Sequence, residues 1–279
     1  MLEMLSIPFM RQAVLASLIL AAMLAYLGIH VVRRRIVFVD LAIAQLSAVG
    51  VALAMLLDQD PIGFSLVFTM IGAGLLSLPT YERRIPQEAI MGIVYAVASA
   101  AAVLIVAKMP HGEADILNLF FGNILAVTDG QIGLMALTFG SVSLVHLIFA
   151  KRLMPISVPT EPRSTFLFKA MSWNLLFYLT LAVVIAVAIR TAGVLLVFSD
   201  LIIPAVVALL FAERLRSLVL LSVVVGVLSN LAGLYASYRF DLPSGPAIVA
   251  SLGIVLALAM IGKSVALTIF SRSGKSGPK

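Results

Sequence analysis

Long apolar stretches alternate with short polar segments along almost the whole chain. A helix needs about 20 mostly apolar residues to cross a bilayer. Nine stretches approach or exceed that length: Arg11–Val31, Ile36–Leu57, Ile62–Leu78, Ala89–Ala107, Ile132–Ala150, Trp173–Ile189, Gly193–Phe211, Leu215–Ser237 and Pro246–Phe270. They are apolar all round, without the one-sided stripe that is typical of soluble helices. The pattern predicts an all-α, polytopic membrane helical bundle of about nine transmembrane helices.

The composition agrees with this prediction. Hydrophobic residues make up 62% of the 279 residues and charged residues only 11%, whereas a soluble domain is about half apolar and a quarter charged. The chain has no cysteine, which excludes disulfides and zinc sites built on thiolates. We expect residues 1–279 to form a single transmembrane domain that ends in a flexible cytoplasmic tail over residues 271–279.

Basic residues are concentrated in every second connection between the predicted spans. The basic connections contain Arg33–Arg35, Arg83–Arg84, Lys151–Lys169, Arg214–Arg216 and the tail after Phe270. Because positive residues stay on the cytoplasmic side, this alternation predicts an N-terminus outside and a C-terminus in the cytoplasm. The apolar segment Asp115–Val127 is too short to span and is predicted to be a re-entrant or interfacial helix on the outer side.

One carboxylate, Asp200, lies well inside a predicted span, where a charge requires a partner, a water-filled cavity or a function. Ser199 precedes it, and Pro204 lacks the amide that would donate to the Asp200 carbonyl. Carboxylate, carbonyl and hydroxyl oxygens therefore gather here, and such groups can hold a cation. The alternative is a carboxylate that pairs with Arg190, Lys169 or another basic group and only braces the bundle.

A second carboxylate, Asp40, opens the second predicted span. It lies within two turns of Arg33–Arg35, so an interfacial salt bridge is an alternative to a place in a cation path. Ser47 shares a helix face with Asp40, and the Gln45 amide needs a hydrogen-bond partner or water. The candidate pathway residues are Asp40, Gln45, Ser47, Ser199 and Asp200, of which Asp40 and Asp200 are the candidate metal ligands.

The cytoplasmic connection over residues 206–217 is very short and charged. It contains Ala212, Glu213, Arg214 and Arg216. Such a turn suits insertion into a groove on a soluble partner, which could then transmit a rigid-body motion to the helices. The alternative is a basic turn that only sets topology.

ATP hydrolysis by this chain would require a glycine-rich phosphate loop. Gly274–Lys275–Ser276 resembles the end of that motif, but Ile269 replaces its first glycine and no strand precedes it. The chain is therefore predicted not to be an enzyme. No bound cofactor is expected, and any ATP must bind to a separate subunit.

The stretch GVLLVFSDLIIPAVVALL over Gly193–Leu210 is similar to the motif G-x-L-L-V-x-x-L-L-I-I-P-A. This motif is typical of the zinc/manganese-type ABC importer permease family, which the chain therefore resembles. Two further family signatures resemble LFFGNILAV over Leu119–Val127 and DLPSG over Asp241–Gly245, and Arg33–Gly50 resembles the second-span region. The resemblance covers nearly the whole chain in the same order.

This resemblance implies a type II ABC importer permease fold. It also implies a homodimer in the inner (plasma) membrane of a prokaryote, with cytoplasmic ABC ATPase subunits and an extracytoplasmic solute-binding protein. The cargo would be a divalent transition metal ion (zinc, manganese or iron), carried by alternating access. The ATPase would contact Ala212, Glu213, Arg214 and Arg216. The alternatives are a permease for another small solute or a metal chelate, and an ATP-independent secondary transporter.

The sequence departs from the family in the second span. Family members usually carry Asp and His four residues apart, where this chain has Leu41 and Gln45. Conversely, Asp200 stands where the family motif has a small residue. A path rebuilt from Asp40, Gln45 and Asp200 would present hard oxygen ligands, which favour a different metal from a histidine site.

Overall fold

The computed structural model describes residue 4 and residues 6–78, 85–108, 122–156 and 167–273. Within these ranges the chain forms ten α-helices and one short 3-10 turn and has no strand, which confirms the predicted all-α class. The elements are α2 (Pro8–Arg33), α3 (Val39–Leu56), α4 (Pro61–Ser77), α5 (Gln87–Val106), η1 (Ile124–Ala126), α7 (Asp129–Ile148), α8 (Ala150–Ile156), α9 (Leu167–Ala192), α10 (Val194–Phe211), α11 (Leu215–Phe240) and α12 (Ser244–Ser273).

Each of the nine predicted spans coincides with one long helix, and the polytopic bundle is confirmed. Eight of these helices are long and apolar enough to cross a membrane, whereas α4 is apolar but shorter, with 17 residues. The short helix α8 was not predicted. Only residues 122–127 of the predicted re-entrant segment are described, and they contain η1. In the predicted tail, residues 271–273 belong to α12, and residues 274–279 lie outside the described residues.

Polar residues at the helix ends explain where two of the helices begin. The Asp60 carboxylate accepts hydrogen bonds from the backbone amides of Ile62 and Gly63, at 3.0 and 2.8 Å, and so caps α4. At the start of α7, the side chains of Thr128 and Gln131 each accept from the other residue's backbone amide, forming a capping box. These bonds satisfy amides that a helix N-terminus otherwise leaves without partners.

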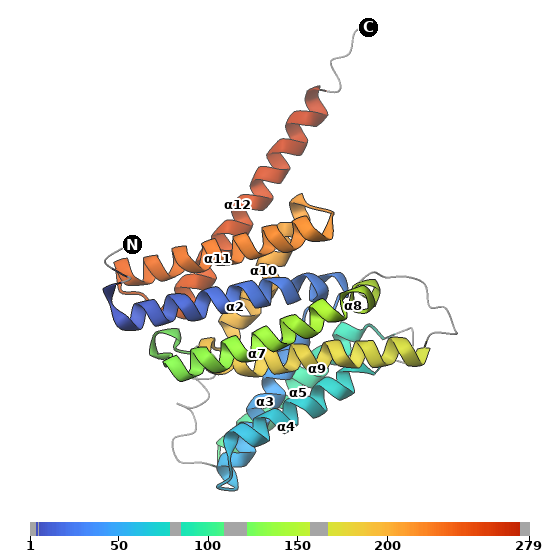
Figure 1. Cartoon of the computed structure of the whole chain (residues 1–279), viewed down its shortest axis with the longest axis vertical. Coiled ribbons are helices and arrows are strands. Elements are labelled where there is room, and N and C mark those ends of the chain that lie inside the picture. The colour runs from blue at the N-terminus through green and yellow to red at the C-terminus, as the bar shows by residue number, and fades with distance from the viewer. Residues whose placement is uncertain (1–3, 5, 79–84, 109–121, 157–166, 274–279) are drawn as a thin grey trace.

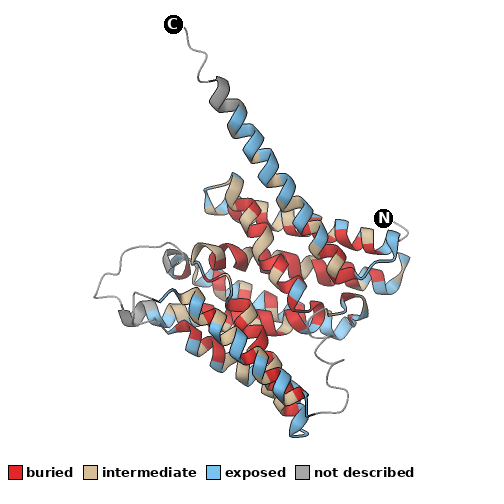
Figure 2. Cartoon of the chain, turned by 180° about the vertical axis from the view of Figure 1, so that it is seen from behind, coloured by how far each residue is buried: buried red, intermediate tan, exposed pale blue. Residues whose placement is uncertain are grey.

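The helices form two packed groups. In the first, α3 packs against α4 and α5; in the second, α2, α10, α11 and α12 pack together. Helix α9 contacts both groups, and α2 and α11 lie side by side along their length (Figure 1). Buried residues are concentrated in the middle of the bundle, as the red segments in Figure 2 show. The helices that carry Asp40 and Asp200, α3 and α10, are therefore each enclosed by several other helices.

Helices α2 and α10 come unusually close at Gly28. A Cβ atom on Gly28 would lie 1.7 Å from the carbonyl oxygen of Leu201, so only glycine fits at this position. Small residues permit close approach of membrane helices. In lipid, such helices are held together by dispersion contacts, because the hydrophobic effect does not drive their association there. This contact holds α10 against α2 at the residue next to Asp200.

Candidate cation pathway and coupling turn

Asp200 is completely buried in α10 and is hydrogen-bonded to α11. Its Oδ1 atom accepts a 2.6 Å hydrogen bond from Nδ2 of Asn230, which also donates to the carbonyl of Gly226 at 2.9 Å. Two buried oxygens, Oδ2 of Asp200 and Oδ1 of Asn230, have no hydrogen-bond partner within the described residues. Since buried polar atoms are normally satisfied, these two acceptors indicate a place for a positive charge or a proton donor.

The described part of the chain places no basic side chain against Asp200. Arg190, one of the two named candidates for a bracing ion pair, instead extends to the carbonyl of Pro61 at 3.5 Å. The side chain of Lys169, the other candidate, lies outside the described residues. In the described residues the polar contact of Asp200 across helices is therefore with Asn230.

The neighbours of Asp200 on α10 contribute fewer free groups than the sequence suggests. The Ser199 hydroxyl donates a 2.8 Å hydrogen bond to the carbonyl of Leu195, one turn earlier, and retains only its acceptor capacity. Pro204 lies inside the continuous helix α10 and removes the amide that would bond the Asp200 carbonyl.

Asp40 is also buried, with 2% of its surface exposed. Its Oδ1 atom accepts a 2.8 Å hydrogen bond from the amide of Leu41 at the start of α3. Among the described residues Asp40 forms no ion pair, so the alternative of a salt bridge with the Arg33–Arg35 cluster is not seen there. Arg34 turns toward α9 instead, where Nη1 donates to Oδ1 of Asn174 at 3.1 Å and the guanidinium lies 3.7 Å from the Phe177 ring centroid.

The two other polar candidates on α3 differ in their surroundings. The Ser47 hydroxyl lies 2.8 Å from that of Ser65 and links α3 to α4. Gln45 is 3% exposed, and its side chain has no hydrogen bond in the described structure. Ser47 thus contributes to helix packing, while the Gln45 amide stays available.

The candidate metal ligands lie at different depths. Asp40 is the second residue of α3, whereas Asp200 is eleven residues from the end of α10 at Phe211. At a rise of about 1.5 Å per residue, Asp200 is about 17 Å inside that end. In the described residues no three or more histidine, cysteine or acidic side chains gather into a metal-binding group. The structure therefore joins Asp200 to Asn230 and leaves Asp40 separate.

A buried polar cluster on α2, α7 and α9 was not predicted. The hydroxyl of Tyr26 lies 3.2 Å from Nδ1 of His146, and Nε2 of His146 lies 2.9 Å from the hydroxyl of Thr180. The His30 ring lies 6.4 Å from that of His146. The sequence shows only that Tyr26 and His30 share a face of one helix, because their partners come from distant parts of the chain. This cluster links three helices near the end of α2.

The predicted coupling turn is a connection of three residues, Ala212–Arg214, between α10 and α11. Ala212 is half-buried in it. Helix α10 continues to Phe211, so the turn itself is shorter than the predicted range 206–217. The side chains of Glu213, Arg214 and Arg216 are exposed. Lys263 of α12 reaches this end of α10 and donates a 2.7 Å hydrogen bond to the carbonyl of Leu210.

Comparisons with known proteins agree with this architecture. Residues 6–263 match the model of the ABC 3 transport family. The manganese transport system membrane protein MntB of Synechocystis sp. is 29% identical over 268 residues, which cover 94% of this chain and 85% of MntB. The corresponding protein MntC of Halalkalibacterium halodurans is 27% identical over 259 residues, covering 92% of this chain and 88% of MntC.

A solved structure has the same fold. The chain is similar to one chain of PsaBC from Streptococcus pneumoniae, determined in complex with Fab, with a TM-score of 0.74 and 25% identity. The match covers 92% of this chain and 93% of that chain, and it confirms the type II importer permease fold. Since the family model spans nearly all of the sequence, the ATP-independent secondary transporter is set aside. The chain belongs to the ABC 3 transport family and is a multi-pass membrane permease subunit rather than an enzyme.

Proposed function

We propose that this permease imports a divalent transition metal ion, with manganese as the first candidate among manganese, zinc and iron. The observation that carries the proposal is the similarity over almost the full length to relatives named as manganese transport proteins. The chemistry of the site supports it, because carboxylate and amide oxygens suit manganese, whereas imidazole suits zinc. The second span has no histidine, and Asp200 and Asn230 offer oxygen atoms alone.

In this proposal Asp200 and Asn230 form the buried cation site between α10 and α11. Both side chains are fully buried, and each has one oxygen without a hydrogen-bond partner in the described residues. Ser199, the residue before Asp200 on α10, retains acceptor capacity as a further candidate oxygen. Because the site is closed, a shift of α10 against α11 must open it, and such a shift is the alternating-access step.

The remaining candidates would serve the cation elsewhere on the path. Asp40 lies at the predicted cytoplasmic end of α3, where it would act as a second ligand for the cation on its way to the cytoplasm. Gln45 would offer its amide oxygen farther along the same helix, with Ser47 as an acceptor on the face of Asp40. These residues and the Asp200 site would be occupied in succession.

The partners follow from the same proposal. ABC ATPase subunits would supply ATP hydrolysis and dock on the turn formed by Ala212, Glu213, Arg214 and Arg216. A solute-binding protein would deliver the cation to the opposite face of a homodimer. The complex would lie in the inner membrane of a prokaryote, with the N-terminus outside and the C-terminus in the cytoplasm, as the basic connections favour.

Substitutions at Asp200 test the proposed site. Asp200→Asn keeps the shape of the side chain but removes its negative charge, and Asp58→Asn makes the same change at an exposed residue beyond the end of α3. The wild type and both variants would be reconstituted in liposomes with the ATPase and binding protein, and manganese accumulation would be measured. We expect Asp200→Asn to lose at least about tenfold in uptake, as for ~1.4 kcal/mol of lost binding, and Asp58→Asn to match the wild type.

The protein level in the membrane separates transport from bracing. Normal manganese uptake by Asp200→Asn would contradict a ligand role. If Asp200→Asn instead failed to accumulate as folded protein, the carboxylate would be a brace between α10 and α11. A normal level with lost uptake supports the cation site, and a wild type that carries a metal chelate but no free manganese would refute the proposed cargo.

A further inference from the structure

Lys263 makes a contact that the proposed function does not use. It is the twentieth of the 30 residues of α12. Its Nζ atom donates a 2.7 Å hydrogen bond to the carbonyl of Leu210 in the last turn of α10. The last four carbonyls of an α-helix have no amide partner within the helix and carry a partial negative charge. The ammonium group of Lys263 therefore satisfies one such carbonyl and complements the helix dipole at the same point.

The position of Lys263 is distinct from that of its neighbours on α12. Most of this helix beyond Leu252 is uncovered: Leu258 is 62% exposed, Ile261 60% and Val265 52%. Figure 2 shows the same segment in pale blue as it leaves the bundle. Lys263 itself is only partly exposed, because its side chain turns back to α10. An apolar side chain would be sufficient for a helix that only faces lipid, so the lysine has a separate role.

The contact lies directly before the coupling turn. Leu210 is the penultimate residue of α10, and the turn Ala212–Arg214 follows at once. Toward the other end of the same hairpin, Asn230 of α11 holds Asp200 of α10 at 2.6 Å. The hairpin of α10 and α11 is therefore fixed by α12 beside the turn and by its own polar bond at the candidate cation site.

We propose that Lys263 is a positioning residue for energy coupling. By capping α10 it fixes the direction in which the helix enters the coupling turn, so that a movement of the ATPase displaces α10 and with it Asp200. Without the cap, the last turn of α10 can unwind and absorb that movement. This inference rests on the proposed function, because it requires an ATPase that docks on the turn.

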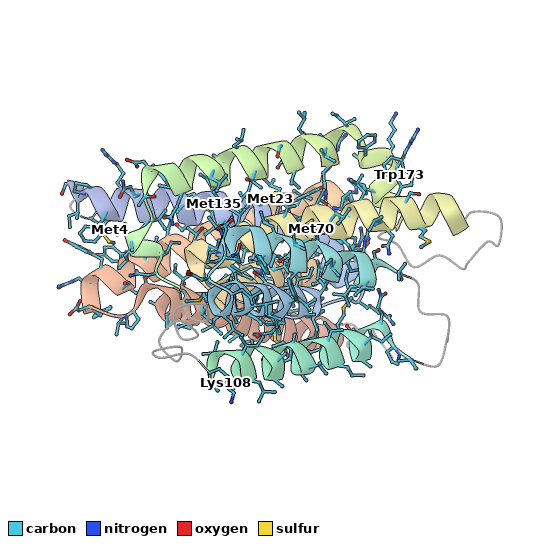
Figure 3. All side chains as sticks on the ribbon, turned by 90° about the horizontal axis from the view of Figure 1, so that it is seen from below. Met4, Met23, Met70, Lys108, Met135 and Trp173 are labelled. Atoms are coloured by element: carbon cyan, nitrogen blue, oxygen red, sulfur yellow. The ribbon has the colours of Figure 1, made fainter. Side chains whose placement is uncertain are left out.

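The test compares three lysine variants in the complete transporter. Lys263→Met keeps a long, flexible stem but removes the donor and the charge, and Lys263→Arg keeps both. Lys108→Met is the matched control, because Lys108 is exposed beyond the end of α5, at the lower edge of Figure 3. For each variant in liposomes with ATPase and binding protein, the manganese ions imported per ATP hydrolysed are measured, together with the amount of ATPase that co-purifies.

We expect Lys263→Met to lower the number of ions imported per ATP by about tenfold, the effect of losing one charge-assisted hydrogen bond, while the ATPase still co-purifies. Lys263→Arg should stay near the wild type, and Lys108→Met should equal it. An unchanged ratio in Lys263→Met would overturn the inference. The inference would also be overturned if less Lys263→Met protein folded but the assembled part still imported as many manganese ions per ATP as the wild type. If the wild type itself imports no manganese with ATP, the proposed function is refuted, independently of the result for Lys263→Met.

Discussion

The close approach of α2 and α10 at Gly28 gives a quantitative prediction for Gly28→Ala. The added Cβ would lie 1.7 Å from the carbonyl oxygen and 2.8 Å from the carbonyl carbon of Leu201. Both atoms belong to the backbone of α10 and cannot rotate away. Since ordinary contact begins at 3.4 Å, α2 and α10 must move apart by about 1.7 Å.

The cost of this separation follows from packing. Overfilling a packed interior costs about 1–3 kcal/mol where side chains can adjust. We expect about 3 kcal/mol for Gly28→Ala, because here a rigid helix must shift. The shift would also displace Asp200, the residue before Leu201, from its neighbours on α11.

Thermal unfolding in detergent measures this effect against two matched variants. Gly140→Ala on α7 introduces a Cβ that meets no neighbouring atom within 4 Å. It should keep the apparent unfolding temperature or raise it slightly, because alanine favours a helix over glycine. Gly72→Ala would meet Cδ1 of Leu46 at 2.2 Å, but this atom is the end of a flexible side chain, so its effect should be intermediate. A Gly28→Ala protein that unfolds at the same temperature as Gly140→Ala would refute the close α2–α10 contact.

Three further outcomes are expected. Ser47→Ala should destabilise the fold by about 1 kcal/mol in the same unfolding assay, because it leaves the buried Ser65 hydroxyl without its interhelical partner; no change would mean that the two hydroxyls are not paired. Thr128→Ala removes the capping box of α7 and should cost about 1 kcal/mol, which Thr128→Ser should largely restore. Backbone hydrogen bonds lower the pKa of Asp60 below its ordinary value, so its cap on α4 should persist at neutral pH. Lowering the pH should release this cap only below the ordinary pKa of an aspartate carboxyl, and Asp60→Asn should remove that step.

The hydropathy pattern was sufficient for the main architecture. Each of the nine predicted apolar stretches is a helix, since in a membrane the backbone must satisfy its own hydrogen bonds and apolar side chains must face lipid or other helices. The position of Asp200 within a span and the exposure of Glu213 and Arg214 were also predictable. Asp200 lies six residues from the nearer end of α10, whereas Glu213 and Arg214 lie in the turn beyond its other end.

Side-chain partners were not predictable in the same way. The sequence places Arg34 near Asp40, but packing turns it toward Asn174, a residue 140 positions away. Likewise, nothing local predicts that Asn230 meets Asp200, 30 positions apart, because that contact depends on how α11 rotates against α10. Hydropathy fixes which residues enter the membrane, whereas the shapes of the helix surfaces decide which of them meet.

ATP-driven metal accumulation by the reconstituted wild-type complex tests the central claim most directly. The permease, its ATPase and its binding protein would be placed in liposomes, and manganese inside the vesicles would be measured with and without ATP. The account predicts manganese accumulation that requires ATP hydrolysis and stops with a non-hydrolysable analogue. The account would be contradicted if the vesicles accumulated neither manganese nor zinc nor iron. It would also be contradicted by uptake that persists without ATP and follows only a proton or sodium gradient.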